Sequence, residues 1–422
     1  MKHDEWHIER MVPGGDGFVR LPDGRVGFCA DTAPGDRVEV LDVEDHRSYL
    51  RATRFALLAP GPGRVEPPCP AAHTCGGCDW MHLSRETELE QKGRMLREAL
   101  ARTGGFHELP SSLPVVSAGS PERYRGRLRL HVDREGHLGL FAKASHELVE
   151  VESCLVAHEE VERAFLEVRK IAQEFPGALA HFTELDVRVA PEGPRIVLSF
   201  KRRDDRPTGG ERFLAALSSR FVVTVVGEAS DADDQRFPLP GGISLTAPPQ
   251  AFTQVNWAVN EKLVQAVVEG ARERGAKRFC DLYCGAGNFA LPLFAAGLTG
   301  VGVDRGGAGI RAARNAAASQ GQPASAFFAG DVRRILPELV RRGERFDLLV
   351  MDPPRTGIRD VLHEVAGLGA PHVAVVSCDP VTLARDLKGL RKAGYALASV
   401  TGFDMFPHTH HLEALAWLSR AA

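Results

Sequence analysis

The chain has 422 residues, of which 44% are hydrophobic and 25% charged, so it is long enough for two or three domains with apolar cores and is not a disordered protein. It has no apolar run that could cross a membrane, and its polar, acidic first residues are unlike a signal peptide, so we expect a cytoplasmic protein whose 8 cysteines stay reduced. The net charge of −3 excludes a globally basic surface, so any nucleic-acid contact must be made by local basic residues.

Residues from about Trp6 to Pro60 predict a small all-β unit. Glycine pairs and Asp-Gly or Pro-Gly steps mark its turns, and residues 37–43 alternate as a half-buried strand does. Short strands at this spacing suit an OB-like barrel, a fold that often binds single-stranded RNA. An SH3-like module fits the same pattern equally well.

A Pro-Gly break at 60–63 is followed by Cys69, Cys75 and Cys78 in the spacing C-x5-C-x2-C. In a reduced chain this spacing predicts a metal or cluster site, because the tight second pair can wrap one centre. Four thiolates are needed, and Cys154 is the natural fourth although it is remote in sequence. An iron–sulfur cluster and a structural zinc ion both take four thiolates, so the spacing leaves both open.

The middle of the chain mixes helix and strand patterns. Residues 86–102 and 158–175 predict helices. Residues 123–130 alternate as a strand with arginines on one face. That face would suit contacts to phosphates, although a solvated strand face is the commoner explanation.

From about Thr246 the chain alternates strands with helices and ends in a pair of strands, which predicts an α/β fold with a doubly wound sheet. The first strand runs from Arg278 to Tyr283 and leads into a glycine turn at 284–288 that opens a helix. Ligands of such sheets bind outside the carboxyl ends of the strands.

The glycine turn alone does not separate S-adenosylmethionine from a dinucleotide, because both classes use one. The turn lacks the third glycine of a pyrophosphate site, and the next three strands end in Asp304, Asp331 and Asp352. Carboxylates suit a cofactor with a sulfonium and an amino group better than one with phosphates. The alternative is that these acids cap helices.

Cys378 ends the fifth strand, in the sequence Ser-Cys-Asp-Pro, and Glu413 begins the last one. If the last strand is antiparallel, both groups lie at the cofactor edge of the sheet. A thiolate nucleophile and a carboxylate base are what methylation of a non-nucleophilic ring carbon requires. Taken singly, a core cysteine and a solvent-facing glutamate are the commoner explanations.

Over nearly its whole length the chain resembles the RNA uracil-C5 methyltransferases. The resemblance lies in five successive motifs, namely residues 250–256, 281–289, 352–357, 377–378 and the stretch that ends at Glu413. The N-terminal unit, residues 1–60, is similar to the family's TRAM domain. The cysteine motif with Cys154 resembles the [4Fe–4S] site of the ribosomal-RNA branch, in a central unit of residues 61–245 that precedes the methyltransferase domain at 246–422.

The resemblance implies roles for individual residues. Cys378 would be the nucleophile, Glu413 the base, and Phe252 the residue that lies against the target base. The S-adenosylmethionine site would be lined by Gln254, Tyr283, Asn288, Asp304, Asp331 and Asp352. Two positions depart from the family pattern, since Asp379 stands where an asparagine is usual and Val375 where a tyrosine is usual. An acid beside Cys378 is expected to raise the pKa of its thiol.

These features predict a monomeric enzyme that methylates C5 of a uridine in RNA. The resemblance of the cysteine motif to the ribosomal-RNA branch implies that the substrate is 23S ribosomal RNA. A tRNA uridine methyltransferase and a cluster-bearing RNA-binding factor without activity are the alternatives. A cytosine-C5 enzyme would normally show a Pro-Cys pair and a second catalytic cysteine, and a radical S-adenosylmethionine enzyme a C-x3-C-x2-C motif. No cysteine of residues 246–422 follows a proline, and the sequence has no C-x3-C-x2-C run.

Overall fold

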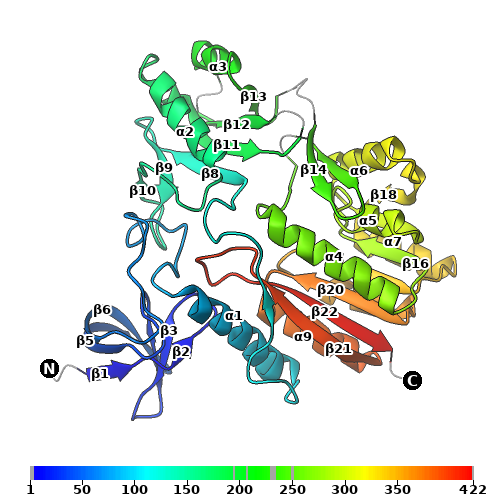
Figure 1. Cartoon of the computed structure of the whole chain (residues 1–422), viewed down its shortest axis with the longest axis horizontal. Helices are drawn as coiled ribbons and strands as arrows, with labels where there is room; N and C mark the ends of the chain where they lie inside the picture. Colours follow the sequence, from blue (N-terminus) through cyan, green and yellow to red (C-terminus); the bar gives the residue numbers. More distant parts are fainter. Residues whose placement is uncertain (1–3, 193–194, 206–207, 229–233, 249–250, 421–422) are drawn as a thin grey trace.

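The computed structural model describes residues 4–192, 195–205, 208–228, 234–248 and 251–420. Three large sheets and one hairpin follow one another along the chain (Figure 1). No helix in these ranges is both long and apolar enough to cross a bilayer.

The N-terminal sheet has six strands in the order β1-β5-β6-β4-β3-β2. Their bounds are β1 Asp4–His7, β2 Arg10–Met11, β3 Gly17–Arg20, β4 Val26–Cys29, β5 Arg37–Asp45 and β6 Tyr49–Ala59. Trp6, Ile8 and Val38 are buried in a small core of their own. The predicted turn at Gly14-Gly15 is present, with φ of +100° and +92°, a backbone region that favours glycine.

Helix α1, Arg85–Ala99, follows and continues as a π-helical turn, η1, over Leu100–Gly104. The Ser84 side chain accepts a hydrogen bond from the Thr87 amide and so caps the start of α1. The predicted helix over 86–102 is therefore confirmed. Its apolar side packs with α9 of the last domain, beside which it lies in Figure 1.

The second sheet has the order β10-β9-β8-β11-β12-β13. Its elements are β8 Arg127–Val132, β9 Leu138–Phe141, β10 Leu148–Val149, α2 Glu159–Ala172, η2 Leu179–His181, β11 Phe182–Val189, β12 Ile196–Arg202, α3 Glu211–Ser218 and β13 Val222–Val225. Helices α2 and α3 share one core with this sheet. A hairpin of β14 Gln235–Leu239 and β15 Ile243–Ala247 then leads to the last domain.

The arginine-bearing strand is shorter than predicted and its arginines have acidic partners. Strand β8 begins at Arg127, whose guanidinium group binds both carboxylate oxygens of Asp186 on the neighbouring strand β11. Arg129 lies 3.6 Å from both Glu184 and Asp186. The strand face is therefore engaged within the protein, as cross-strand pairs of opposite charge usually are.

The C-terminal sheet has eight strands in the order β18-β17-β16-β19-β20-β22-β21-β7. Its strands are β7 Val115–Val116, β16 Arg278–Leu282, β17 Thr299–Asp304, β18 Phe327–Ala329, β19 Leu348–Met351, β20 His372–Ser377, β21 Tyr395–Phe403 and β22 Glu413–Arg420. The five strands β16 to β20 are parallel, and β22 is antiparallel to both of its neighbours.

Helices cover both faces of this sheet, which confirms the predicted doubly wound α/β fold. Helices α4 Trp257–Glu273, α5 Ala290–Ala295 and α6 Gly307–Ser319 pack in one core. Helices α1, α7 Val332–Arg341, α8 Leu362–Gly367 and α9 Pro380–Lys392 pack in the other, and short 3-10 turns lie at η3 Ala324–Ala326 and η4 Arg359–Val361. Parallel order puts the carboxyl ends of β16 to β20 at one edge of the sheet.

Candidate active site and cysteine centre

Cys378 and Glu413 are brought together by strand register. Strand β22 is antiparallel to β20, and Ser377 pairs with Ala414. One step further along the same register, Cys378 stands opposite Glu413 at the edge where the parallel strands end. The expected arrangement of the last strand is confirmed, and the thiol and the carboxyl that the sequence predicts as a pair are neighbours.

The Glu413 carboxyl is buried next to another acid, Asp352. Its residue is 4% exposed, and burial together with the nearby Asp352 raises the pKa of Glu413 well above its ordinary value. Burial raises the pKa of Asp352 as well. A carboxyl whose pKa is raised in this way is, once ionised, a stronger base than a solvated carboxylate.

The Cys378 thiol is half-buried and directly follows β20. Burial raises the pKa of Cys378, and the charges of Glu413 and Asp352 raise it further, while Arg355 acts in the opposite direction. Arg355 is thus a functional candidate that sequence reasoning missed, although it stands in the quoted motif at 352–357. The positive charge of Arg355 favours the thiolate form of Cys378.

The two departures from the family pattern have structural explanations. The Asp379 side chain accepts a hydrogen bond of 2.6 Å from the Thr382 amide and caps α9, with Pro380 in the first turn. The acids with the largest effect on the pKa of Cys378 are Glu413 and Asp352, both of which raise it. Val375 is buried in the core beneath the sheet.

The glycine turn after β16 is held by Asp304. The Asp304 carboxylate at the end of β17 accepts hydrogen bonds from the Gly285 amide at 3.1 Å and the Gly306 amide at 2.6 Å. Tyr283, Gly285 and Gly287 have positive φ angles of 65°, 55° and 94°. The backbone there is open to close approach by a ligand, as cofactor turns require.

Asn288 and the segment before α4 are linked to each other. The side-chain amides of Asn288 and Asn260 exchange two hydrogen bonds of 3.0 Å. Asn260 lies in the first turn of α4, just after the segment that holds Phe252 and Gln254. Phe252 is 72% exposed, which is unusual for a phenylalanine, and Gln254 is half-buried. Gln250, the first residue of this motif, is outside the described residues.

Asp331 has the contacts of the helix cap that the sequence left open as an alternative, and a further acid, Asp281, was not predicted. Asp331 caps α7 through the Arg333 amide and forms an ion pair with the Arg333 side chain, bonds that lower its pKa to about 2. Its contacts are therefore those of a helix cap. Asp281 was not predicted as a site residue, yet it is fully buried, one of its oxygens has no partner, and burial and Asp352 raise its pKa. A charged residue inside an apolar strand was the available signal.

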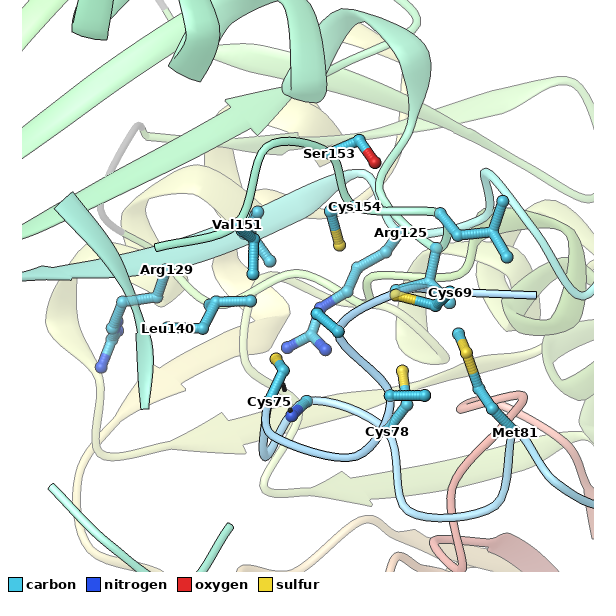
Figure 2. Close-up of a pocket in the computed structure, with 16 residues that line it drawn as sticks. Cys69, Cys75, Cys78, Met81, Arg125, Arg129, Leu140, Val151, Ser153 and Cys154 are labelled. Atoms are coloured by element: carbon cyan, nitrogen blue, oxygen red, sulfur yellow. Dashed lines mark hydrogen bonds between the residues drawn. The ribbon is translucent and has the colours of Figure 1, made fainter. Parts of the chain in front are cut away.

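The four predicted thiolates, Cys69, Cys75, Cys78 and Cys154, line one cavity of about 110 Å³, and we call them the cysteine centre. Figure 2 shows their sulfurs around this space, with the guanidinium group of Arg125 directed among them. Burial raises the pKa of the Cys75, Cys78 and Cys154 thiols, and the charge of Arg125 acts against that rise. Sequence reasoning missed Arg125 because its strand pattern suggested a surface position.

The sulfurs of the cysteine centre are widely spaced. Among the described residues, which include all four cysteines, the one set of three metal-ligand side chains whose ligand atoms lie within 4.8 Å of one another is Asp133, Glu135 and His137. No three of the four sulfurs are that close. The cavity between them is walled by Met81, Leu140 and Val151.

Comparisons with known proteins show the family to which the chain belongs. The family model described as tRNA (Uracil-5-)-methyltransferase matches residues 243–301 and 334–421, which include the glycine turn, Cys378 and Glu413. A protein of Vibrio parahaemolyticus named 23S rRNA (uracil(1939)-C(5))-methyltransferase RlmD is 30% identical over 100% of this chain and 97% of its own length. The chain belongs to the S-adenosylmethionine-dependent RNA uracil-C5 methyltransferase family.

Other members of the RNA uracil-C5 methyltransferase family give the same result. The RlmD protein of Pectobacterium atrosepticum is 32% identical over 97% of this chain and 92% of its own. The crystal structure of a Pyrococcus abyssi tRNA (uracil-54, C5)-methyltransferase in complex with S-adenosyl-L-homocysteine covers 98% of this chain, with a TM-score of 0.75 and 23% identity. That similarity shows a shared fold.

Proposed function

We propose that this enzyme transfers a methyl group from S-adenosylmethionine to C5 of a uridine in 23S ribosomal RNA, through a covalent bond between Cys378 and C6 of the base. The observation that carries the proposal is the strand register that sets Cys378 opposite Glu413. The rRNA substrate is supported by the relatives that bear that name over nearly their full length.

The reaction begins at the thiol. Arg355 favours the Cys378 thiolate, which adds to C6 and moves the electron pair of the C5–C6 double bond onto C5. S-adenosylmethionine supplies the methyl group that C5 then takes from the sulfonium, and S-adenosylhomocysteine is released. A cysteine suits this role because it both attacks and leaves.

The reaction ends at Glu413. The ionised carboxylate takes the proton from C5, the double bond forms again, and the Cys378 thiolate is expelled. Glu413 is suited to this step because its pKa is raised by burial and by Asp352, which brings its basicity closer to that needed at neutral pH. In Glu413→Gln the proton stays on C5, so we expect methylated RNA to remain bonded to Cys378.

The residues at the strand ends fit S-adenosylmethionine. Asp304 and Asp352 offer carboxylates beside the positive-φ turn at 283–287, a charge pattern that suits the ribose hydroxyls and the cationic part of the cofactor. We assign Gln254, Tyr283, Asn288 and Asp331 to the same site, and the exposed Phe252 to stacking against the flipped base.

The cysteine centre fits a [4Fe–4S] cluster. A single zinc ion would need its sulfurs about 3.8 Å apart, since four Zn–S bonds of about 2.3 Å point to the corners of a tetrahedron. The wider spacing here suits a larger group, and the Arg125 charge in the cavity offsets the negative charge of such a cluster. A bound cluster would have redox capacity, but the proposed methyl transfer uses none.

We further propose three domains and an RNA-binding arrangement. Residues 1–60 form a TRAM-like barrel that binds RNA, and residues 246–422 form most of the methyltransferase domain. Residues 61–245 carry the cysteine centre, and their α1 and β7 also join the methyltransferase domain. The enzyme acts as a cytoplasmic monomer. The first two units then hold the folded RNA while Phe252 receives the flipped uridine.

The substrate is tested by mapping 5-methyluridine by mass spectrometry in ribosomal and transfer RNA from a strain that lacks this protein. We expect one or more uridines of 23S RNA to lose the methyl group, and the gene for the unchanged protein, but not Cys378→Ala, to restore it. Loss confined to tRNA would contradict the rRNA assignment.

A further inference from the structure

Glu413 directly follows a loop that makes contacts far from the sheet. Residues 404–412, here called the base loop, connect β21 to β22. Its first part is held by α1, where the buried Lys92 and Arg85 pair with Asp404, and Lys92 also donates a hydrogen bond of 3.1 Å to the Phe406 carbonyl. The Glu88 carboxylate of α1 also accepts a hydrogen bond of 2.8 Å from the His408 amide, so α1 holds the loop as far as His408. Residues 409–411 lie beyond these contacts.

The tip of the base loop is held by the residues that follow Cys78. The Asp79 carboxylate accepts a hydrogen bond of 3.0 Å from the His410 amide and a second from the His410 ring. The Trp80 amide donates to the His408 carbonyl at 2.9 Å. The two residues after a ligand of the cysteine centre therefore bind the base loop on both sides of Thr409.

The N-terminal barrel reaches the same point. The Trp80 ring nitrogen donates a hydrogen bond of 3.0 Å to the Gly15 carbonyl, and Trp80 is completely buried. A Cβ atom at Gly15 would overlap the Asp79 carboxylate and would lie 3.3 Å from the ring nitrogen Nδ1 of His410. Gly15 is thus a glycine because the barrel turn lies directly against the Asp79–His410 pair.

We propose that Asp79 is a positioning residue for Glu413, which ties the base loop to the cysteine centre and to the barrel. Removal of the C5 proton then runs at full rate only when all three parts are docked. This inference rests on the proposed role of Glu413. Its physical basis is that a carboxylate displaced by about 1 Å can lose about 100-fold in rate.

The test uses holoenzyme with Asp79→Ala and Gly15→Ala, and with Gly14→Ala as the matched control. Gly14 has the same kind of backbone, with φ of +100°, but a Cβ atom there meets nothing within 4 Å. We expect kcat to fall roughly 10- to 100-fold in the first two variants, with KM for RNA and cofactor within about twofold. Gly14→Ala should match the unchanged enzyme.

Two further readouts separate positioning from a general loss of structure. If proton removal is the impaired step, Asp79→Ala should accumulate the methylated covalent adduct expected of Glu413→Gln. Amides of residues 405–412 should also exchange hydrogen faster, while those of β19 and β20 stay protected. A kcat equal to that of the unchanged enzyme, or a loss of kcat without adduct and with normal exchange, would overturn the proposal.

The outcomes also separate this inference from the proposed function. If Glu413→Gln itself forms no adduct, the assignment of the base is wrong, and the exchange rates still decide whether Asp79 holds the loop. If Asp79→Ala loses iron, the test rests on Gly15→Ala instead. That variant displaces the Asp79 carboxylate from the barrel side, and its kcat and exchange rates then decide whether Asp79 positions the base loop.

Discussion

The two functional regions of the molecule use the same side chain in different surroundings. At the sheet edge one half-buried thiol, Cys378, stands between the acid Glu413 and the cation Arg355. In the cysteine centre four thiols enclose a cavity with Arg125, and two of them, Cys75 and Cys154, are buried. Burial raises the thiol pKa in both regions, so burial alone does not decide what a cysteine does.

Cys280 and Cys284 make the contrast clearer. They lie in and just after β16, burial and nearby acids raise the pKa of both, and Cys284 packs in an apolar core. Arg278 acts against that rise beside Cys280, as Arg355 does beside Cys378, so a nearby cation does not by itself separate the two cysteines. The difference lies in access: Cys378 is half-buried and the four thiols of the cysteine centre line a cavity, whereas Cys280 and Cys284 are buried in the sheet and its core.

The largest expected effect is on the cysteine centre. Anaerobically purified protein should hold about four irons per chain, and Cys75→Ser should lose the brown colour, because a cubane needs all four thiolates. Cys284→Ser, which removes a buried thiol outside the centre, should keep the iron. Stoichiometric zinc without iron in the unchanged protein would contradict the assignment of a [4Fe–4S] cluster to the cysteine centre.

The next effect concerns the cofactor edge of the sheet. Asp304→Ala should weaken S-adenosylmethionine binding by about 1.5–3 kcal/mol, roughly 10- to 150-fold, because charge-assisted hydrogen bonds are lost. Asp331→Ala should lose less, since the Asp331 carboxylate is already paired with Arg333. Isothermal titration calorimetry measures both, and equal affinity in Asp304→Ala would reduce Asp304 to a support for the glycine turn.

A smaller effect is expected at the exposed aromatic ring. Phe252→Ala should weaken RNA binding by about 1–3 kcal/mol, the usual value of stacking a base on an aromatic side chain. Phe328→Ala removes another exposed ring, 41% accessible, and serves as the control. Fluorescence titration with a labelled RNA gives both values, and equal losses would show that Phe252 has no special role.

The smallest effect is a pH dependence of stability. In the unfolded chain Glu413 ionises near its ordinary pKa, whereas in the folded protein burial and Asp352 raise that pKa, so ionisation opposes folding as the pH rises between the two values. Glu413→Gln should therefore be more stable than the unchanged protein, by a margin that grows from pH 5 to pH 8. Thermal melting at both pH values measures this gain. Glu338→Gln, which changes a side chain that is 44% exposed, should show no such gain.

Much of the fold follows from local patterns. Glycine turns and strand alternation predicted the order of strands and helices in the C-terminal part of the chain. The connection between the final two strands predicted that β22 is antiparallel, and the β20–β22 register then sets Cys378 opposite Glu413. These features depend on neighbours in sequence. The π-helical turn after α1 had no local signal, because it depends on packing against α9.

Contacts between distant segments explain what the sequence did not reveal. The Arg127–Asp186 pair engages a strand face that the pattern left open, and the Asp79–His410 pair joins residues 331 positions apart. The unpaired oxygen of Asp281 is visible only once the strand is known to be central. Such contacts are set by tertiary packing, which one sequence read along its length does not specify.

The central claim is that Cys378 is the nucleophile and Glu413 the base. It is tested most directly by incubating Glu413→Gln with substrate RNA and cofactor labelled in its methyl group, then searching for a denaturation-resistant protein–RNA band. We expect a labelled band, a digest in which the modified nucleotide is attached to the peptide that contains Cys378, and no band with Cys378→Ala. A band formed without Cys378, or normal turnover by Glu413→Gln, would contradict the account.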